Sequence, residues 1–304
     1  MEVIPAQAGI QLTSIEMVSP IITDSQVHLW EAHRPDRPWP EESIGKPVFV
    51  AAKGAREHRA EPLGAEEMLG MMDGAGVRRA IIVPPSPVGD GNLTALEAAA
   101  RYPERFAIMG RFNPEAPGSR SRLETWLDQP GMVGIRLTFH KPQWQHWLDD
   151  ASMHWFWGGC ERQGIPLMMF VPGLVARVPR LAERYPGLTL ILDHMARRSE
   201  LRDDECFSDL DRLLALARYP NIAIKTSAVP CYSTQPYPFA NLEPYLERIH
   251  DAFGPQRLLW GSDVSRLPCT YRECVDHFRN ELDFLTDSDK ASILGGTLSQ
   301  LLRW

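Results

Sequence analysis

Short apolar runs recur along the chain, and segments of helical periodicity separate them. The short runs have the continuous apolar or period-two pattern of strands in a parallel sheet. The helical segments, such as residues 65–75, 92–101, 210–218 and 242–253, repeat their apolar positions every three or four residues. The predicted strands are residues 20–28, 79–83, 105–111, 132–140, 165–171, 188–194, 222–227 and 257–263.

The tripeptide Arg-Tyr-Pro marks a recurring junction at residues 101–103, 184–186 and 218–220, each time between a helical segment and a strand. Proline ends the helix there, and the next apolar run begins a strand. Strands that alternate with helices predict an α/β fold with parallel strands. Eight such strands in a chain of 304 residues fit one (β/α)8 TIM barrel with insertions.

We assign a single barrel domain to residues 20–304, with long loops after strands 1 and 4 at residues 31–62 and 141–151. Residues 1–19 are predicted to be a disordered or leader segment, and we give residues 1–16 no function. A doubly wound open sheet is the alternative fold. It is disfavoured because no Gly-x-Gly-x-x-Gly or Gly-Lys-Ser/Thr phosphate loop follows any predicted strand.

Charge and composition narrow the range of partners. A net charge of −7 and an isoelectric point near 5.7 offer no general attraction to nucleic-acid phosphates or anionic lipid. The sequence contains neither an apolar run of membrane-spanning length nor a signal-peptide pattern. The five cysteines form no Cys-x-x-Cys pair, which is typical of reduced thiols. We expect a cytoplasmic protein that binds a small molecule and neither nucleic acid nor membrane, and a homo-oligomer is left open.

Polar side chains stand at the carboxyl ends of the predicted strands, where TIM barrels place their active sites. A hydrogen-bonded core or surface role would explain any one of them. Their recurrence at one end of the barrel favours a shared site. They are Gln26 and His28, His140 and Lys141, Asp193 and His194, Lys225 and Ser227, and Asp263.

Gln26 and His28 lie on one face of the first strand, because side chains two residues apart point the same way. A neutral imidazole is a good zinc ligand. A glutamine amide is instead a hydrogen-bonding group and a poor ligand for zinc.

Several motifs resemble the amidohydrolase-2 branch of the amidohydrolase superfamily, with the greatest likeness to 2-pyrone-4,6-dicarboxylate lactonases and sugar-lactone hydrolases. The resemblance spans nearly the whole chain, from Asp24 to Trp304, and the order of the motifs makes it specific. They are Ile-Arg-Leu at 135–137, Leu-Asp-His-Met-Ala-Arg at 192–197, Leu-Trp-Gly-Ser-Asp at 259–263 and Ile-Leu-Gly-Gly-Thr at 293–297.

The resemblance implies roles for individual residues. Asp263 matches the strand-8 aspartate that activates water, His194 matches the strand-6 histidine facing the scissile carbonyl, and His28 matches the second histidine of a His-x-His pair. Arg136 and Arg197 match positions at which lactonases of this branch bind substrate carboxylates. The chain departs from the family's pattern at Gln26, where histidine is usual, and at Val264-Ser265, where Trp-Pro is frequent.

These departures lead us to expect catalysis without a metal or other cofactor, with one zinc ion at His28, His194 and Asp263 as the alternative. In the metal-free mechanism, a water held by Asp263 attacks an ester or amide carbonyl. Hydrogen bonds from His28, His194 and Gln26 stabilise the oxygen as it gains charge.

The expected substrate is a flat ring that carries a carboxylate. Trp30 follows His28 and is predicted to stack on the ring. Arg136 and Arg197 are predicted to bind the carboxylate, and His140 and Lys225 complete the substrate-binding set.

We therefore predict a hydrolase that opens a lactone or a related cyclic amide of an unsaturated or aromatic-derived carboxylic acid, in the catabolism of aromatic compounds. A metal-dependent decarboxylase or hydratase of an aromatic-derived acid is one alternative. A non-catalytic ligand-binding barrel is the other.

Overall fold

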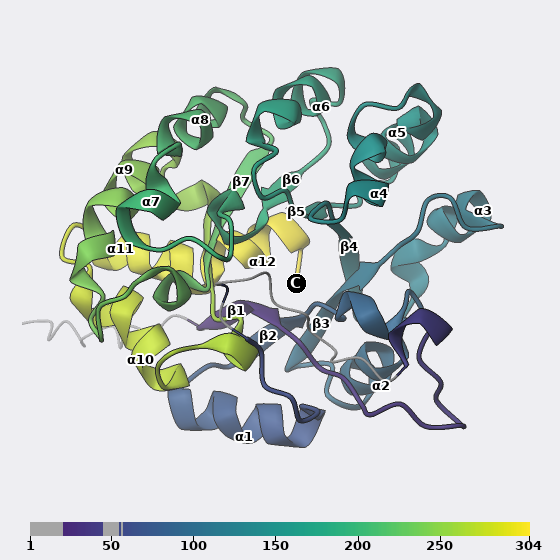
Figure 1. Ribbon diagram of the computed structural model, residues 1–304, viewed down its shortest axis with the longest axis horizontal. Coiled ribbons are helices and arrows are strands. Elements are labelled where there is room, and N and C mark those ends of the chain that lie inside the picture. The colour runs from purple at the N-terminus through teal and green to yellow at the C-terminus, as the bar shows by residue number, and fades with distance from the viewer. Residues whose placement is uncertain (1–20, 45–54, 56) are drawn as a thin grey trace, which may run out of the picture.

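The computed structural model describes residues 21–44, 55 and 57–304 of the chain (Figure 1). Eight strands form one sheet in which each strand pairs in parallel with the next along the chain, from β1 to β8. The strands are β1 (Thr23–Val27), β2 (Arg79–Ile82), β3 (Phe106–Arg111), β4 (Met132–Thr138), β5 (Leu167–Phe170), β6 (Leu190–Leu192), β7 (Ile222–Ser227) and β8 (Leu258–Gly261).

Hydrogen bonds join the last strand to the first and nearly close the barrel. The backbone N–H of Asp263 donates to the carbonyl of Gln26 at 3.0 Å. The Asp24 carboxylate accepts the backbone N–H of Ser262 at 2.9 Å and the Tyr271 hydroxyl at 2.7 Å. The predicted (β/α)8 TIM barrel is therefore confirmed.

Helices surround the strands, as Figure 1 shows. Within the described residues no helix is long and apolar enough to cross a membrane. The α-helices are α1 (Ala65–Ala75), α2 (Leu93–Arg101), α3 (Ser119–Glu124), α4 (Pro142–Gln145), α5 (His154–Gln163), α6 (Val178–Arg184), α7 (Asp203–Phe207), α8 (Leu210–Leu214), α9 (Glu243–Phe253), α10 (Tyr271–Asp276), α11 (Asp287–Ala291) and α12 (Thr297–Leu302).

The core has two layers, which follow from the alternation of side chains on each strand. One layer fills the barrel interior and includes Ile81, Met109, Met168 and Leu259. The other packs the outer faces of the strands against the helices. Gly134 on β4 permits the close interior packing, because a Cβ there would lie 2.6 Å from the sulfur of Met109.

Two expectations about the connections need correction. The segment 141–151, predicted to be a long loop, contains α4 and a 3-10 helix at His146–Leu148. The helix predicted over 210–218 divides into α8 and a 3-10 helix at Ala215–Arg218. The long connection after β1 includes residues 45–54 and 56, which lie outside the described residues, as does the predicted segment 1–19.

Candidate active site and metal centre

The inward row of the barrel changes from apolar to polar toward the carboxyl ends of the strands. On β3, Arg111 lies two residues beyond the interior residue Met109, and on β7, Lys225 lies two beyond Ala223. Because side chains alternate with a period of two, these cationic groups lie above the apolar layer that fills the barrel interior. Arg136 follows Gly134 on β4 in the same way.

A cavity of about 720 Å³ opens above these residues, within the usual range for a small-molecule site. Its described lining contains five cationic residues and two acidic ones. The cations are Arg111, Arg136, Lys141, Arg198 and Arg266, and the acids are Glu200 and Asp263.

Backbone in the left-handed region gathers at the carboxyl ends of three neighbouring strands. Three consecutive residues after β6, His194, Met195 and Ala196, have φ of 53°, 55° and 54°. Ala228 after β7 has φ 56°, and Asp263 after β8 has φ 54°. Such conformations are costly for residues other than glycine and concentrate at functional sites. Here they turn the chain so that His194 and Asp263 reach the cavity.

The tautomer of His28 is set by its own surroundings. Its Nδ1 lies 2.6 Å from the carbonyl oxygen of Val83, to which only an N–H can donate. Its Nε2 therefore faces Oδ1 of Asp263, at 3.2 Å. A neutral imidazole would place a lone pair against the carboxylate, so a cation between them, either a proton or a metal ion, satisfies both atoms.

Asp263 is a buried carboxylate that keeps its charge. Burial alone would raise its pKa. The Arg266 guanidinium, whose Nε lies 2.5 Å from Oδ2, and the nearby histidines outweigh that effect and hold the pKa well below its usual range. Asp263 is thus ionised at neutral pH.

His194 lies on the other side of Asp263, with its Nε2 3.8 Å from Oδ2. Burial lowers its pKa well below the usual value, so the ring is neutral. Its Nδ1 lies 2.8 Å from the Ser227 hydroxyl. When that hydroxyl donates to Nδ1, the ring carries its proton on Nε2 and can donate into the cavity.

Gln26 is held by a buried network beneath the cavity. Lys225 Nζ donates to Oε1 of Gln26 and lies 2.7 Å from Oδ1 of Asp193. The second oxygen of Asp193 lies 2.7 Å from Nε of Arg136. Because the ammonium is only a donor, the amide oxygen must face Lys225 and the NH2 group must face His28, whose Nε2 lies 3.2 Å away.

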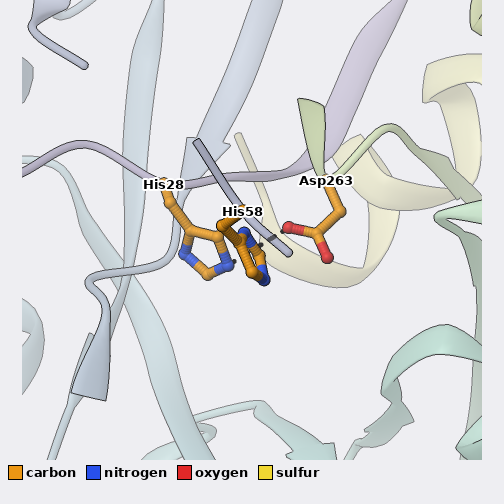
Figure 2. A group of neighbouring side chains, drawn as sticks. All are labelled: His28, His58 and Asp263. Atoms are coloured by element: carbon orange, nitrogen blue, oxygen red, sulfur yellow. Dashed lines mark ion pairs between the residues drawn. The ribbon is translucent and has the colours of Figure 1, made fainter. Parts of the chain in front are cut away.

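Figure 2 shows His28, His58 and Asp263 gathered in one group. Each offers one ligand atom, and these atoms lie within 4.8 Å of one another. Burial lowers the pKa of His58 to about 3, so its ring is in the neutral form that binds metals. Two imidazoles and a carboxylate are a ligand set that suits zinc and leaves a position open for water or substrate. The residues present therefore fit a divalent ion.

The structure brings most of the predicted site residues to the cavity. Gln26, His28, Arg136, His140, His194 and Asp263 line it.

Three predicted substrate contacts are absent from the described lining of the cavity. Arg197 is buried elsewhere and binds Asp209 at 2.5 Å and the carbonyl of Cys206 at 3.0 Å. Trp30 is buried in the outer core layer, and Lys225 lies beneath Gln26. These three residues stabilise the fold or position other side chains, so the proposed stacking on Trp30 is not supported by the geometry.

Sequence reasoning missed several residues of the cavity, among them His58, Arg111 and Arg266. Arg111 ends β3 on the inward row of the barrel, so the strand-end rule could have found it. Arg266 follows Asp263 by three residues, within reach of its carboxylate. His58 lies in a connection without regular pattern, and no sequence signal marks it.

Fold and site together define a class of protein: a TIM-barrel enzyme with a candidate metal centre at the carboxyl ends of its strands. Residues 23–304 match the family model described as amidohydrolase. The chain therefore belongs to the amidohydrolase family, and the protein is a hydrolase.

Three similar proteins illustrate the relationship. The L-fucono-1,5-lactonase of Burkholderia ambifaria is 22% identical over 294 residues, covering 92% of this chain and 94% of that protein. An amidohydrolase of Burkholderia multivorans, solved with bound zinc, has a TM-score of 0.74 at 22% identity and covers 93% of this chain and 99% of that one. A probable 2-pyrone-4,6-dicarboxylic acid hydrolase of Acinetobacter baumannii, solved with citric acid, has a TM-score of 0.68 at 17% identity, over 94% and 100%.

The expectation of a cofactor-free enzyme is wrong. The chain belongs to a family whose members typically bind a metal, a structural neighbour carries zinc, and the fold assembles a ligand group. The group of possible ligands that the structure assembles is His28, His58 and Asp263, whereas the alternative set had His194 in place of His58. The expectation failed because only residues at the ends of strands were considered as replacements for the strand-1 histidine, whereas His58 lies in the connection after β1.

Proposed function

We propose that this protein hydrolyses a lactone that carries a carboxylate, using Asp263 and its neighbours at the metal centre. The observation that carries the proposal is the charge of the cavity: an ionised Asp263 stands opposite an excess of cationic side chains. The names of the relatives, a sugar-lactone hydrolase and a probable pyrone dicarboxylate hydrolase, support ring opening of a cyclic ester.

The cationic excess lies on one side of the cavity. Arg266 and Arg198 pair with Asp263 and Glu200, at 2.5 Å each. The other cations of the lining are Arg111, Arg136 and Lys141, of which Arg136 pairs with Asp193 beneath the cavity and Arg111 lies 3.5 Å from Asp90. Burial, together with the charges of Lys141, Arg136 and Arg111, lowers the pKa of His140 to about 4. The positive charges of these three side chains, which disfavour a proton on His140, would stabilise an anion at the same place. A substrate carboxylate would bind there, and the guanidinium groups could hold it with paired hydrogen bonds.

The reacting carbonyl would then lie near Asp263. A divalent ion held by His28, His58 and Asp263 would supply Lewis acidity, which polarises an ester carbonyl and makes water more acidic. Asp263, with its low pKa, is a suitable base only for water made acidic in this way. The neutral His194 ring and the Gln26 NH2 group can donate hydrogen bonds to the carbonyl oxygen as it gains charge.

Proton return completes the reaction. The proton that Asp263 takes from water is delivered to the leaving oxygen of the opened ring. Arg266 keeps Asp263 oriented and ionised between turnovers, because its guanidinium binds Oδ2. The products are a hydroxy acid, or its keto form when the leaving group is an enol.

A matched pair of substrates tests the proposal: an unsaturated lactone bearing a carboxylate and the same lactone without it. Proton release at constant pH reports ring opening. We expect the zinc-loaded protein to open the carboxylate-bearing lactone. Arg111→Gln should raise KM for that lactone by about 10-fold or more, since a hydrogen bond to a charged group contributes about 1.5–3 kcal/mol, and should leave KM for the uncharged lactone unchanged.

Arg120→Gln is the control for this experiment, because Arg120 is an exposed arginine on α3 outside the cavity lining. Its KM for both lactones should equal that of the wild type. Turnover of an aromatic carboxylic acid with release of carbon dioxide, and of no lactone, would favour the decarboxylase alternative and exclude the proposal.

A further inference from the structure

The Gln26 amide cannot act as a metal ligand in this arrangement. The amide oxygen is the only atom of the amide that could bind a metal ion. It accepts a hydrogen bond from the Lys225 ammonium instead. Lys225 is fully buried between Gln26 and Asp193, and because its ammonium only donates, it fixes the amide oxygen in this orientation. The NH2 group that faces His28 has no lone pair to offer a metal. The first strand therefore supplies one ligand, His28.

A second imidazole reaches the same position from the connection between β1 and α1. The ring of His58 lies 5.6 Å from the ring of His28, centroid to centroid, with the two planes at 63°. Figure 2 shows the two rings together beside the Asp263 carboxylate. His58 is half-buried, and it lines the cavity.

Two hydrogen bonds to Ser265 hold the His58 segment in place. Nδ1 of His58 lies 2.7 Å from the Ser265 hydroxyl, and the backbone N–H of Arg59 donates to the Ser265 carbonyl at 2.7 Å. Ser265 follows Asp263 by two residues, within the 3-10 helix Val264–Arg266. The hydroxyl thus links one member of the ligand group to the segment that carries another.

From this arrangement we infer that His58 is a metal ligand that replaces the second strand-1 ligand lost at Gln26, and that Ser265 is its positioning residue. With Nδ1 at the Ser265 hydroxyl, Nε2 is the nitrogen of His58 that would bind the metal ion, and the hydroxyl fixes the ring, as outer partners of metal-binding histidines generally do. The inference rests on the metal centre of the proposed function and is independent of which lactone is opened.

Cobalt(II) binding to a cysteine variant tests the ligand role directly. A cysteine thiolate bound to cobalt(II) gives a charge-transfer band in the near ultraviolet. We expect this band in His58→Cys with one equivalent of cobalt(II), because the new thiolate replaces the imidazole. The five native cysteines lie outside the cavity lining, so the wild type should bind cobalt(II) without the band. His146→Cys, at an exposed histidine paired with Glu115, is the matched control and should also lack it.

Zinc affinity, measured by competition with a chromophoric chelator, tests the positioning role. Ser265→Ala should weaken zinc binding by about 10–100-fold, the range for loss of an outer partner, and His58→Ala should weaken it further. A folded His58→Cys protein without the band, or a His58→Ala protein that binds zinc as tightly as the wild type, would overturn the inference. A band in His58→Cys, together with a zinc-loaded wild type that opens no lactone, would instead refute the proposed function and leave the ligand assignment standing.

Discussion

Asp263 is the residue on which the chemistry depends, and its surroundings explain both its charge and its orientation. Arg266 binds one carboxylate oxygen, and His28 faces the other at 3.2 Å. A carboxylate held ionised in this way can bind a metal ion and accept a proton, whereas an amide of the same shape can do neither well.

Asp263→Asn should therefore lower the turnover of the lactone by about two to four orders of magnitude, the range expected for loss of a general base. Substrate binding, followed by competition or calorimetry, should persist because Arg111 and Arg136 remain. Asp211→Asn is the control, since Asp211 is exposed and pairs with Arg248 outside the cavity. Turnover within a few-fold of the wild type would show that another group takes the proton.

His277 offers a prediction about pH and stability. Burial lowers the pKa of its imidazole to about 4, from 6.5. Between these values the unfolded chain binds the proton and the folded chain does not, so the free energy of unfolding falls as pH falls from about 6.5 to 4. The contribution at its largest is about 3 kcal/mol.

His277→Leu removes the titrating group, and urea unfolding at several pH values should show a smaller loss of stability between pH 6.5 and 4 than in the wild type. His146→Leu, at an exposed histidine, provides the comparison. An unchanged pH slope in His277→Leu would mean that the imidazole of His277 does not resist protonation in the folded state.

At the scale of elements, Asp24 joins the first and last strands of the barrel. Its buried carboxylate accepts the backbone N–H groups of Gln26 and Ser262, both at 2.9 Å, and the Tyr271 hydroxyl at 2.7 Å. These donors come from β1, from the end of β8 and from α10. The closure of the sheet thus depends on one side chain as well as on backbone pairing.

Asp24→Ala should destabilise the protein, because each buried donor left without an acceptor costs about 1–3 kcal/mol. Denaturant unfolding should show a midpoint at lower urea concentration. Asp24→Asn keeps one acceptor oxygen, so its unfolding midpoint should lie between those of Asp24→Ala and the wild type. Equal stability of Asp24→Ala and the wild type would show that the backbone pairing alone closes the barrel.

The elements differ in how far their sequence determines them. The strand at Ile222–Ser227 and the helix at Ala65–Ala75 were predicted with the observed bounds, because each is apolar with a clear period. The strand predicted over 188–194 is only Leu190–Leu192 in the structure. Its last residues leave the strand for left-handed backbone that no apolar pattern reveals.

The site shows the same contrast. Gln26, His28, His194 and Asp263 end strands, so topology alone brings them to one end of the barrel. His58 reaches them through a contact with Ser265, 207 residues further along the chain. A contact of this kind depends on where two irregular segments pack in the folded chain, and local sequence does not encode it.

On the scale of the whole molecule, the sign of the charge around the cavity is opposite to that of the net charge. The chain carries a net charge of −7, yet cationic side chains outnumber acidic ones around the cavity. The excess of cationic side chains around the cavity attracts a small anion to the site. The barrel supports this arrangement because its strand ends direct side chains from distant parts of the chain into one space.

The most direct test of the account is the rate of lactone opening as zinc is titrated into protein from which metal has been removed by a chelator. We expect little turnover of the carboxylate-bearing lactone without zinc, and a rate that rises in proportion to zinc and stops rising at one equivalent per chain. A metal-free protein that opens the lactone as fast as the zinc-loaded protein would contradict the account.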